Sequence, residues 1–130
     1  MEIVEYVAKA RRRAVEQIDS AFTALNEGKT ELAVSCYIRA LEEIGRAKMF
    51  RENLGENIAD ASPSSTITVD GQSMTARDAR LKVAVHYLNE NKIGCPVEIE
   101  NRSYDSLLPE ATLDTLKSSI VALKSLSAFL

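Results

Sequence analysis

The chain has 130 residues, of which 45% are hydrophobic and 27% charged, and its 16 basic and 19 acidic residues give a formal net charge of -3. This length fits a single domain with a substantial core, and the composition excludes a disordered tail. The small negative charge provides no overall attraction to nucleic acid or anionic lipid, so neither is an expected partner.

Membrane insertion, secretion and metal binding are not expected. No segment approaches the roughly 20 apolar residues of a membrane span, and the first residues, MEIVEYVAKARRR, do not resemble a signal peptide. Cys36 and Cys95 lie in different segments without a CxxC motif, and one histidine cannot complete a zinc site with them. We expect reduced thiols in a cytoplasmic protein that needs no metal or cofactor, with a single disulfide as the alternative.

A long amphipathic helix is predicted over residues 2–26, because apolar positions recur there at spacings of three and four. Gly28 can take the left-handed conformation that ends such a helix. The heptad pattern also places Arg11 in the apolar stripe, where it would need a carboxylate partner or a subunit boundary. The predicted stripe consists of Val4, Ala8, Arg11, Val15, Ile18, Phe22 and Leu25.

A second helix is predicted over residues 30–54, with Thr30 as its N-cap. About three residues connect it to the first helix, so the two should form an antiparallel hairpin. Its predicted buried face consists of Ala33, Tyr37, Ala40, Ile44 and Ala47.

A polar loop over residues 57–65 should lead into a short β-hairpin over residues 66–74, with Asp70-Gly71 as the turn. Thr75 and Asp78 resemble a capping box that opens a third helix over residues 75–91. Apolar residues surround nearly the whole of that helix, which is typical of a bundle centre or of a subunit contact.

The stretch from Asn91 to Leu108 is expected to be an extended loop with one edge strand at Val97–Glu100. Pro109 should begin a fourth helix over residues 109–128. Its predicted face consists of Leu113, Leu116, Ile120, Leu123 and Leu130, with Val121, Leu126 and Phe129 filling it out. The predicted fold is therefore all-α, an antiparallel four-helix bundle with a short β-hairpin inserted between helices 2 and 3.

Arg80 and His86 are the candidate catalytic residues, spaced R-x5-H on the third predicted helix. An imidazole and a guanidinium can together cleave RNA without a metal, by handling the 2′-hydroxyl proton and the developing phosphorane charge. Six helical positions turn the two side chains about 120° apart, so a dimer or an irregular helix start would have to align them. The competing interpretation of the lone histidine is a buried, hydrogen-bonded core residue.

A second candidate site is the dense basic cluster formed by Lys9, Arg11, Arg12 and Arg13. Three successive arginines can bind phosphate groups bidentately, but no interleaved aromatic residues would stack bases. On a helix these side chains spread around more than half of the circumference, and such charged runs are usually exposed to solvent. The cluster is a candidate site for a small anionic ligand or a protein partner.

Two segments resemble HEPN-type domains, which are helical bundles of prokaryotic toxin–antitoxin, CRISPR-associated and other defence systems. They are RRRAVEQIDSAFTALNEGKTELAVSCYIRALEEIGRAKM at Arg11–Met49, and RSYDSLLPEATLDTLKSSIVALKSLSA at Arg102–Ala128. The resemblance implies a helical dimer and, in many members, a ribonuclease with an R-x4-6-H motif that Arg80 and His86 would match. Here Leu81 follows the arginine in place of the usual polar residue, and Cys36-Tyr37 stands where paired aromatics are common.

These departures favour a non-catalytic relative. The leading prediction is a homodimeric, cytoplasmic interaction or ligand-binding module in a defence-related context. A metal-independent HEPN-like ribonuclease that uses Arg80 and His86 is one alternative, and a nucleotide-sequestering or small-molecule-sequestering protein is another.

Overall fold

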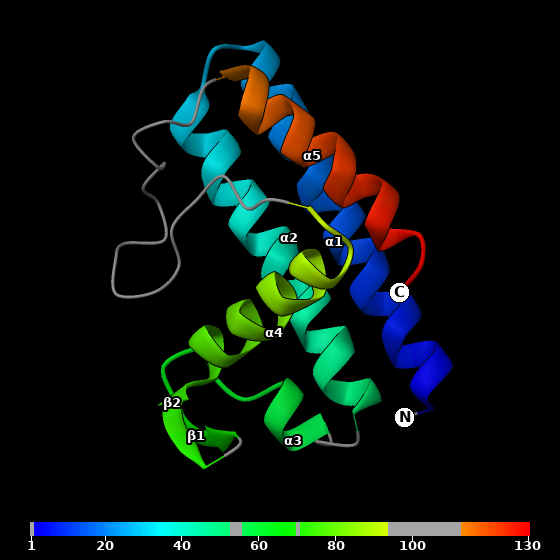
Figure 1. The fold of residues 1–130 in the computed structure, drawn as a ribbon, viewed down its shortest axis with the longest axis vertical. Coiled ribbons are helices and arrows are strands. Elements are labelled where there is room, and N and C mark those ends of the chain that lie inside the picture. Colours follow the sequence, from blue (N-terminus) through cyan, green and yellow to red (C-terminus); the bar gives the residue numbers. More distant parts are fainter. Residues whose placement is uncertain (1, 53–55, 70, 94–112) are drawn as a thin grey trace.

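The computed structural model describes residues 2–52, 56–69, 71–93 and 113–130 (Figure 1). Over these ranges the elements in chain order are α1 (Ile3–Asn26), α2 (Thr30–Arg51), α3 (Glu56–Ala59), β1 (Thr66–Val69), β2 (Gln72–Thr75), α4 (Ala76–Glu90) and α5 (Leu113–Ser127). The predicted class is confirmed, with a hairpin between the second and third of the long helices. The single turn α3 lies where only a loop was expected. The predicted strand at Val97–Glu100 and the helix start at Pro109 lie outside the described residues.

The turn between α1 and α2 has the predicted glycine geometry. Gly28 has φ +75°, and the backbone N–H groups of Lys29 and Gly28 donate to the carbonyls of Ala24 and Leu25 at 2.8 and 3.1 Å. This pair of bonds is the Schellman motif, which satisfies two carbonyls at the helix end. The prediction for Thr30 is wrong, because it is the first residue of α2 and Lys29 occupies the N-cap without a side-chain hydrogen bond.

The buried stripe of α1 differs from the predicted one. Among the predicted positions only Ile18 is buried, and Val4 is 80% exposed. From Val7 to Ala24 the true stripe lies one position earlier except at Ile18, because alanines allow α1 and α2 to approach closely while the larger apolar residues lie on the flank. It consists of Tyr6, Val7, Ala10, Ala14, Ile18, Ala21 and Ala24. On α2 all five predicted residues are buried.

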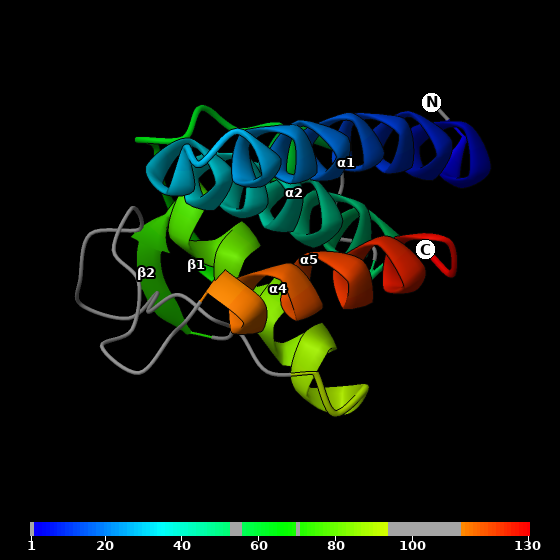
Figure 2. The same ribbon diagram turned by 90° about the horizontal axis from the view of Figure 1, so that it is seen from above.

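Helices α4 and α5 lie on the same side of the α1–α2 hairpin (Figure 2). Among the residues predicted for the face of α5, Leu116, Ile120, Leu123, Leu126 and Leu130 are buried, whereas Val121 and Phe129 are exposed and the side chain of Leu113 lies outside the description. Helix α5 packs mainly against α1. Helix α4 crosses α2 obliquely at Gly45, where a Cβ atom would lie 1.8 Å from the carbonyl oxygen of Arg80. The fully exposed side of α4 is polar, with Lys82, His86, Asn89 and Glu90, while the apolar Val83, Val85 and Tyr87 are partly exposed.

The hairpin forms a second, smaller core with α4. Strands β1 and β2 pair antiparallel from Thr66↔Thr75 to Val69↔Gln72, and Gly71 in the turn has φ +79°. Thr75 caps α4 as predicted, since its Oγ1 accepts the backbone N–H of Asp78 at 3.1 Å. The apolar residues of this core include Tyr6, Met49, Phe50, Ala59, Ala79, Ile67 and Met74.

Candidate functional site

Arg80, the first residue of the R-x5-H motif, is completely buried between α4 and α2. Its Nη1 donates to the carbonyl oxygens of Ala59 and Ala61 at 3.2 and 2.9 Å, and its Nη2 lies 3.5 Å from Glu42 Oε2. The guanidinium therefore ties α4 to α2 and to the segment that follows α3. The sequence pattern did not reveal α3, or the carbonyls of Ala59 and Ala61 as partners of Arg80.

The electrostatics of Arg80 reflect its burial. Desolvation lowers the pKa of Arg80, and the negative charge of Glu42 opposes that change. An arginine keeps its charge in proteins, so Glu42 is the counter-ion that makes this buried position tolerable. The Nε atom of Arg80 is buried without a hydrogen-bond partner among the described residues.

Glu42 is the centre of a larger ion-pair network. Its carboxylate also lies 3.4 Å from Arg77 Nε and 3.8 Å from Arg46 Nη2. Arg46 in turn contacts Glu43 at 3.0 Å, and Glu43 accepts from Arg13 of α1 at 2.9 Å. Chains of such pairs at helix junctions specify how the helices meet, and here they join α1, α2 and α4.

Tyr6 and Asp60 extend this network to the start of α1. The Tyr6 hydroxyl donates to Asp60 Oδ1 at 2.7 Å, and the ring stacks on Phe50 at a centroid distance of 4.0 Å. Burial, the hydrogen bond to Asp60 and the charge of that carboxylate raise the pKa of Tyr6 well above its usual value near 10. The folded protein therefore holds this phenol proton more tightly than the unfolded chain does.

Tyr6 should make the protein sensitive to alkaline pH. Its contribution to stability is fully present below pH 10 and falls as the pH rises above that value, where the unfolded chain ionises first. Tyr6→Phe should cost about 1 kcal/mol at neutral pH through the lost hydrogen bond, and should flatten the pH dependence. Urea unfolding of both proteins at pH 8, 10 and 11 measures this, and parallel pH profiles would contradict it.

His86, the second residue of the motif, does not lie near Arg80. Its side chain is 76% exposed, and its Nε2 lies 2.8 Å from Glu90 Oε1 on the next turn of α4. The two residues thus point to different sides of a regular helix, as the 3.6-residue period requires. Within one chain they form no common cleft, and the competing interpretation of His86 as a buried core residue is wrong.

The basic cluster at the start of α1 is divided among different surroundings. Arg11 donates to the carbonyl oxygen of Leu130, and its Nε is buried without a partner among the described residues. Arg13 pairs with Glu43, Arg12 is exposed and Lys9 is partly exposed. The four side chains therefore do not converge on one anion-binding position. Arg11 has a backbone carbonyl where a carboxylate or a subunit boundary was expected.

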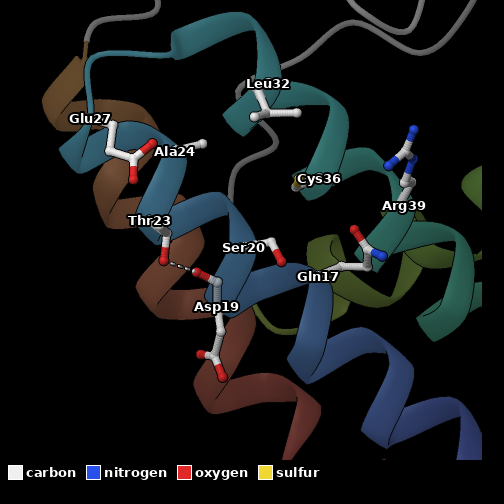
Figure 3. A pocket seen from close by; sticks show the side chains of 9 residues that line it. All are labelled: Gln17, Asp19, Ser20, Thr23, Ala24, Glu27, Leu32, Cys36 and Arg39. Atoms are coloured by element: carbon white, nitrogen blue, oxygen red, sulfur yellow. Dashed lines mark hydrogen bonds between the residues drawn. The ribbon is translucent and has the colours of Figure 1, made fainter.

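A groove on the open face of the α1–α2 hairpin is a hollow that the sequence pattern did not reveal (Figure 3). It has a volume of about 520 Å³, and Leu32 and Arg39 of α2 are exposed beside it. The lining residues are Gln17, Asp19, Ser20, Thr23, Ala24, Glu27, Leu32, Cys36 and Arg39.

Other site types have little support in the described part of the chain. No group of three histidine, cysteine, aspartate or glutamate side chains gathers there as a metal site would require. Cys36 is a buried free thiol, and Cys95 lies outside the described residues. None of the described helices combines the length and the apolar character needed to cross a bilayer.

Comparison with known proteins gives one match. The family model HEPN_AbiV, described as AbiV, matches residues 2–120, which span all the helices except the end of α5. No curated protein and no solved structure matches the chain. The match covers all of the first segment on which the resemblance to HEPN domains was based, and the second segment as far as residue 120.

Proposed function

The chain belongs to the HEPN_AbiV family, whose context is abortive-infection defence against phage, and on that premise we propose that it is a non-catalytic, homo-oligomeric binding module of such a defence system. It acts in the cytoplasm by presenting helix faces to a protein partner, or by holding a small anionic ligand. The ion-pair network supplies a rigid frame for those faces.

The burial of Arg80 is the observation that carries this proposal. A catalytic guanidinium must reach a developing charge on the substrate, usually from a position in a cleft. Here the guanidinium donates to two backbone carbonyls and faces Glu42 instead. The exposed His86 then lacks the partner that would stabilise a phosphorane. A ribonuclease would require Arg80 to leave these contacts, which would take this donor from the carbonyls of Ala59 and Ala61 and one of its counter-ions from Glu42.

Exposed apolar side chains support the homo-oligomeric part of the proposal. Ile3 and Val4 at the start of α1, Leu32 on α2, and Phe129 after α5 are large apolar residues that reach the surface. Isolated cases are ordinary on any protein, so the residue that carries weight is Leu32, which also lines the groove between α1 and α2.

A ribonuclease assay tests the non-catalytic part of the proposal. RNA is incubated in EDTA with the wild-type protein and with His86→Ala, whose exposed side chain can be removed without disturbing the core. We expect equal RNA survival with both proteins. A general acid–base residue contributes about 10²–10⁴-fold to rate, so cleavage by the wild type that drops by this factor in His86→Ala would overturn the proposal and establish the ribonuclease.

The ligand-binding part of the proposal can be tested at Arg12, the exposed residue of the basic cluster. Native mass spectrometry of protein purified gently from cells should reveal a retained small anion if the cluster holds one. Arg12→Glu is the informative variant, because Arg12 is exposed and makes no ion pair among the described residues. If the Arg12→Glu protein retains the same bound anion as the wild type, the basic cluster is not its binding site.

A further inference from the structure

The groove between α1 and α2 is a hollow, and beside it stands Leu32, an apolar side chain that could fill the same hollow on a second copy of the chain. Its floor consists of the small side chains of Ser20, Ala24 and Cys36 (Figure 3). Leu32 stands at its edge and is 48% exposed. No long helix among the described residues covers this face, because α4 and α5 lie on the other side of the hairpin (Figure 2).

The two ends of the groove carry opposite charges. Arg39 lies at one end beside Gln17, and the part of the chain that the structure describes offers Arg39 no hydrogen bond or ion pair. Glu27 lies at the other end, where it makes an exposed contact of 3.1 Å with Lys29. Such exposed pairs contribute little to stability, so Glu27 remains available to another cation.

We propose that this groove is the contact between two copies of the chain, related by a two-fold axis that crosses α2 close to Ser35. The proposal rests on the homo-oligomeric part of the proposed function and names its surface. In this arrangement Leu32 of each copy enters the hollow over the partner's Cys36, and Arg39 of each copy meets the partner's Glu27. The two α2 helices cross on their exposed sides.

A second copy of the chain is the expected occupant, because the groove carries residues that complement one another. A two-fold contact requires that both members of every interacting pair lie on one surface. Here the projecting leucine and the hollow form one such pair, and the cation and the anion at opposite ends form the other. Leu32 and Arg39 are separated by seven residues, or about 10.5 Å of helix, so the two contacts lie two turns apart along α2. If the groove bound an unrelated protein, this chain would need to carry only one member of each pair, and the partner would supply the other.

A charge exchange tests the contact directly. Arg39→Glu and Glu27→Arg each place like charges opposite one another twice in the dimer, and should weaken dimerisation at least about tenfold in Kd. The double variant restores opposite charges and should return Kd to near the wild-type value. Sedimentation equilibrium over a wide concentration range measures all four proteins, and circular dichroism checks that each is folded.

Leu32→Asp gives an independent test with a matched control. Val121 on α5 is exposed to the same degree as Leu32, at 49% and 48%, and lies away from the groove. We expect Leu32→Asp to be monomeric at concentrations where Val121→Asp remains dimeric. Equal behaviour of these two variants would overturn the proposal.

The outcomes separate this proposal from the proposed function. A wild-type protein that is monomeric at every concentration would remove the homo-oligomeric function and this contact together. A wild-type dimer that the Arg39, Glu27 and Leu32 variants leave intact would overturn only the contact, because the dimer would then use another surface. A double variant that fails to recover would also overturn it, since the Arg39–Glu27 pairing would be wrong.

Discussion

Gly45→Ala is expected to destabilise the protein by about 3 kcal/mol, at the upper end of the usual cost of overpacking. Alanine is a better helix former than glycine by about 1 kcal/mol, so local propensity alone predicts the opposite sign. The contact decides the outcome, because the new Cβ would lie 1.8 Å from the carbonyl oxygen of Arg80 and 3.0 Å from its Cα. Both atoms are backbone, so α4 itself would have to move away from α2.

Gly28→Ala is the control for the Gly45 prediction. Gly28 has φ +75°, and no atom lies within 4 Å of the position that the alanine methyl group would take, so an alanine there meets conformational strain without a clash. That strain should cost about 1 kcal/mol. Thermal and urea unfolding compare the two variants. A Gly45→Ala protein as stable as Gly28→Ala would mean that α2 and α4 do not cross at Gly45.

Arg80→Met is expected to lose about 3 kcal/mol of stability, at the lower end of the cost of breaking a buried ion pair. The substitution keeps much of the side-chain volume but leaves the carbonyls of Ala59 and Ala61 without this donor. Glu42 keeps its contacts with Arg46 and Arg77, which limits the loss. Arg80→Lys should recover only part of it, because one ammonium cannot reproduce the planar fork of donors.

The comparison with His86→Ala makes the Arg80 prediction informative about the motif. His86 is exposed and pairs only with Glu90 on its own helix, among the described residues. Its removal should change stability by less than about 0.5 kcal/mol. If urea unfolding instead gave the same small loss for Arg80→Met as for His86→Ala, Arg80 would not hold α4 in place. The structural role assigned to it would then be wrong.

The position of Arg80 shows that the neighbouring elements decide which residue of an R-x5-H motif faces the core. The spacing R-x5-H places two side chains about 120° apart on any regular helix. Which of them faces the core depends on the neighbouring elements. Here α2 presents Glu42 toward Arg80, and the segment after α3 presents two carbonyls, so the arginine is drawn inward while the histidine faces solvent.

Much of the fold could be predicted because its local signals agree with its packing. Gly28 ends α1 through backbone conformation alone, and the side chain of Thr75 caps α4 through one local hydrogen bond. The α2 face from Ala33 to Ala47 was predicted correctly, because that helix packs against neighbours on several sides. The α1 stripe was misplaced by one position, because hydrophobicity favours Val15 and Phe22 whereas close helix contact favours Ala14 and Ala21.

The candidate sites were harder to predict, because they depend on groups that are distant in sequence. Arg80 and Glu42 are 38 residues apart, and the carbonyl of Leu130 that Arg11 contacts is 119 residues away. Backbone carbonyls carry no sequence signal, so neither partner could be identified from residue types. The groove is likewise formed where two helices meet, and the pattern of neither helix alone indicates it.

The sequence by itself determined the mildly acidic character of this chain, and it predicted the long helices of the described residues and the hairpin between them, because periodicity and turn residues act over short distances. The tertiary structure alone decided that Arg80 is a buried anchor, that His86 faces solvent, and that the basic residues from Lys9 to Arg13 have separate surroundings. Burial and charge pairing are properties of how helices meet, and the net charge of -3 carries no information about where each charge finds its partner.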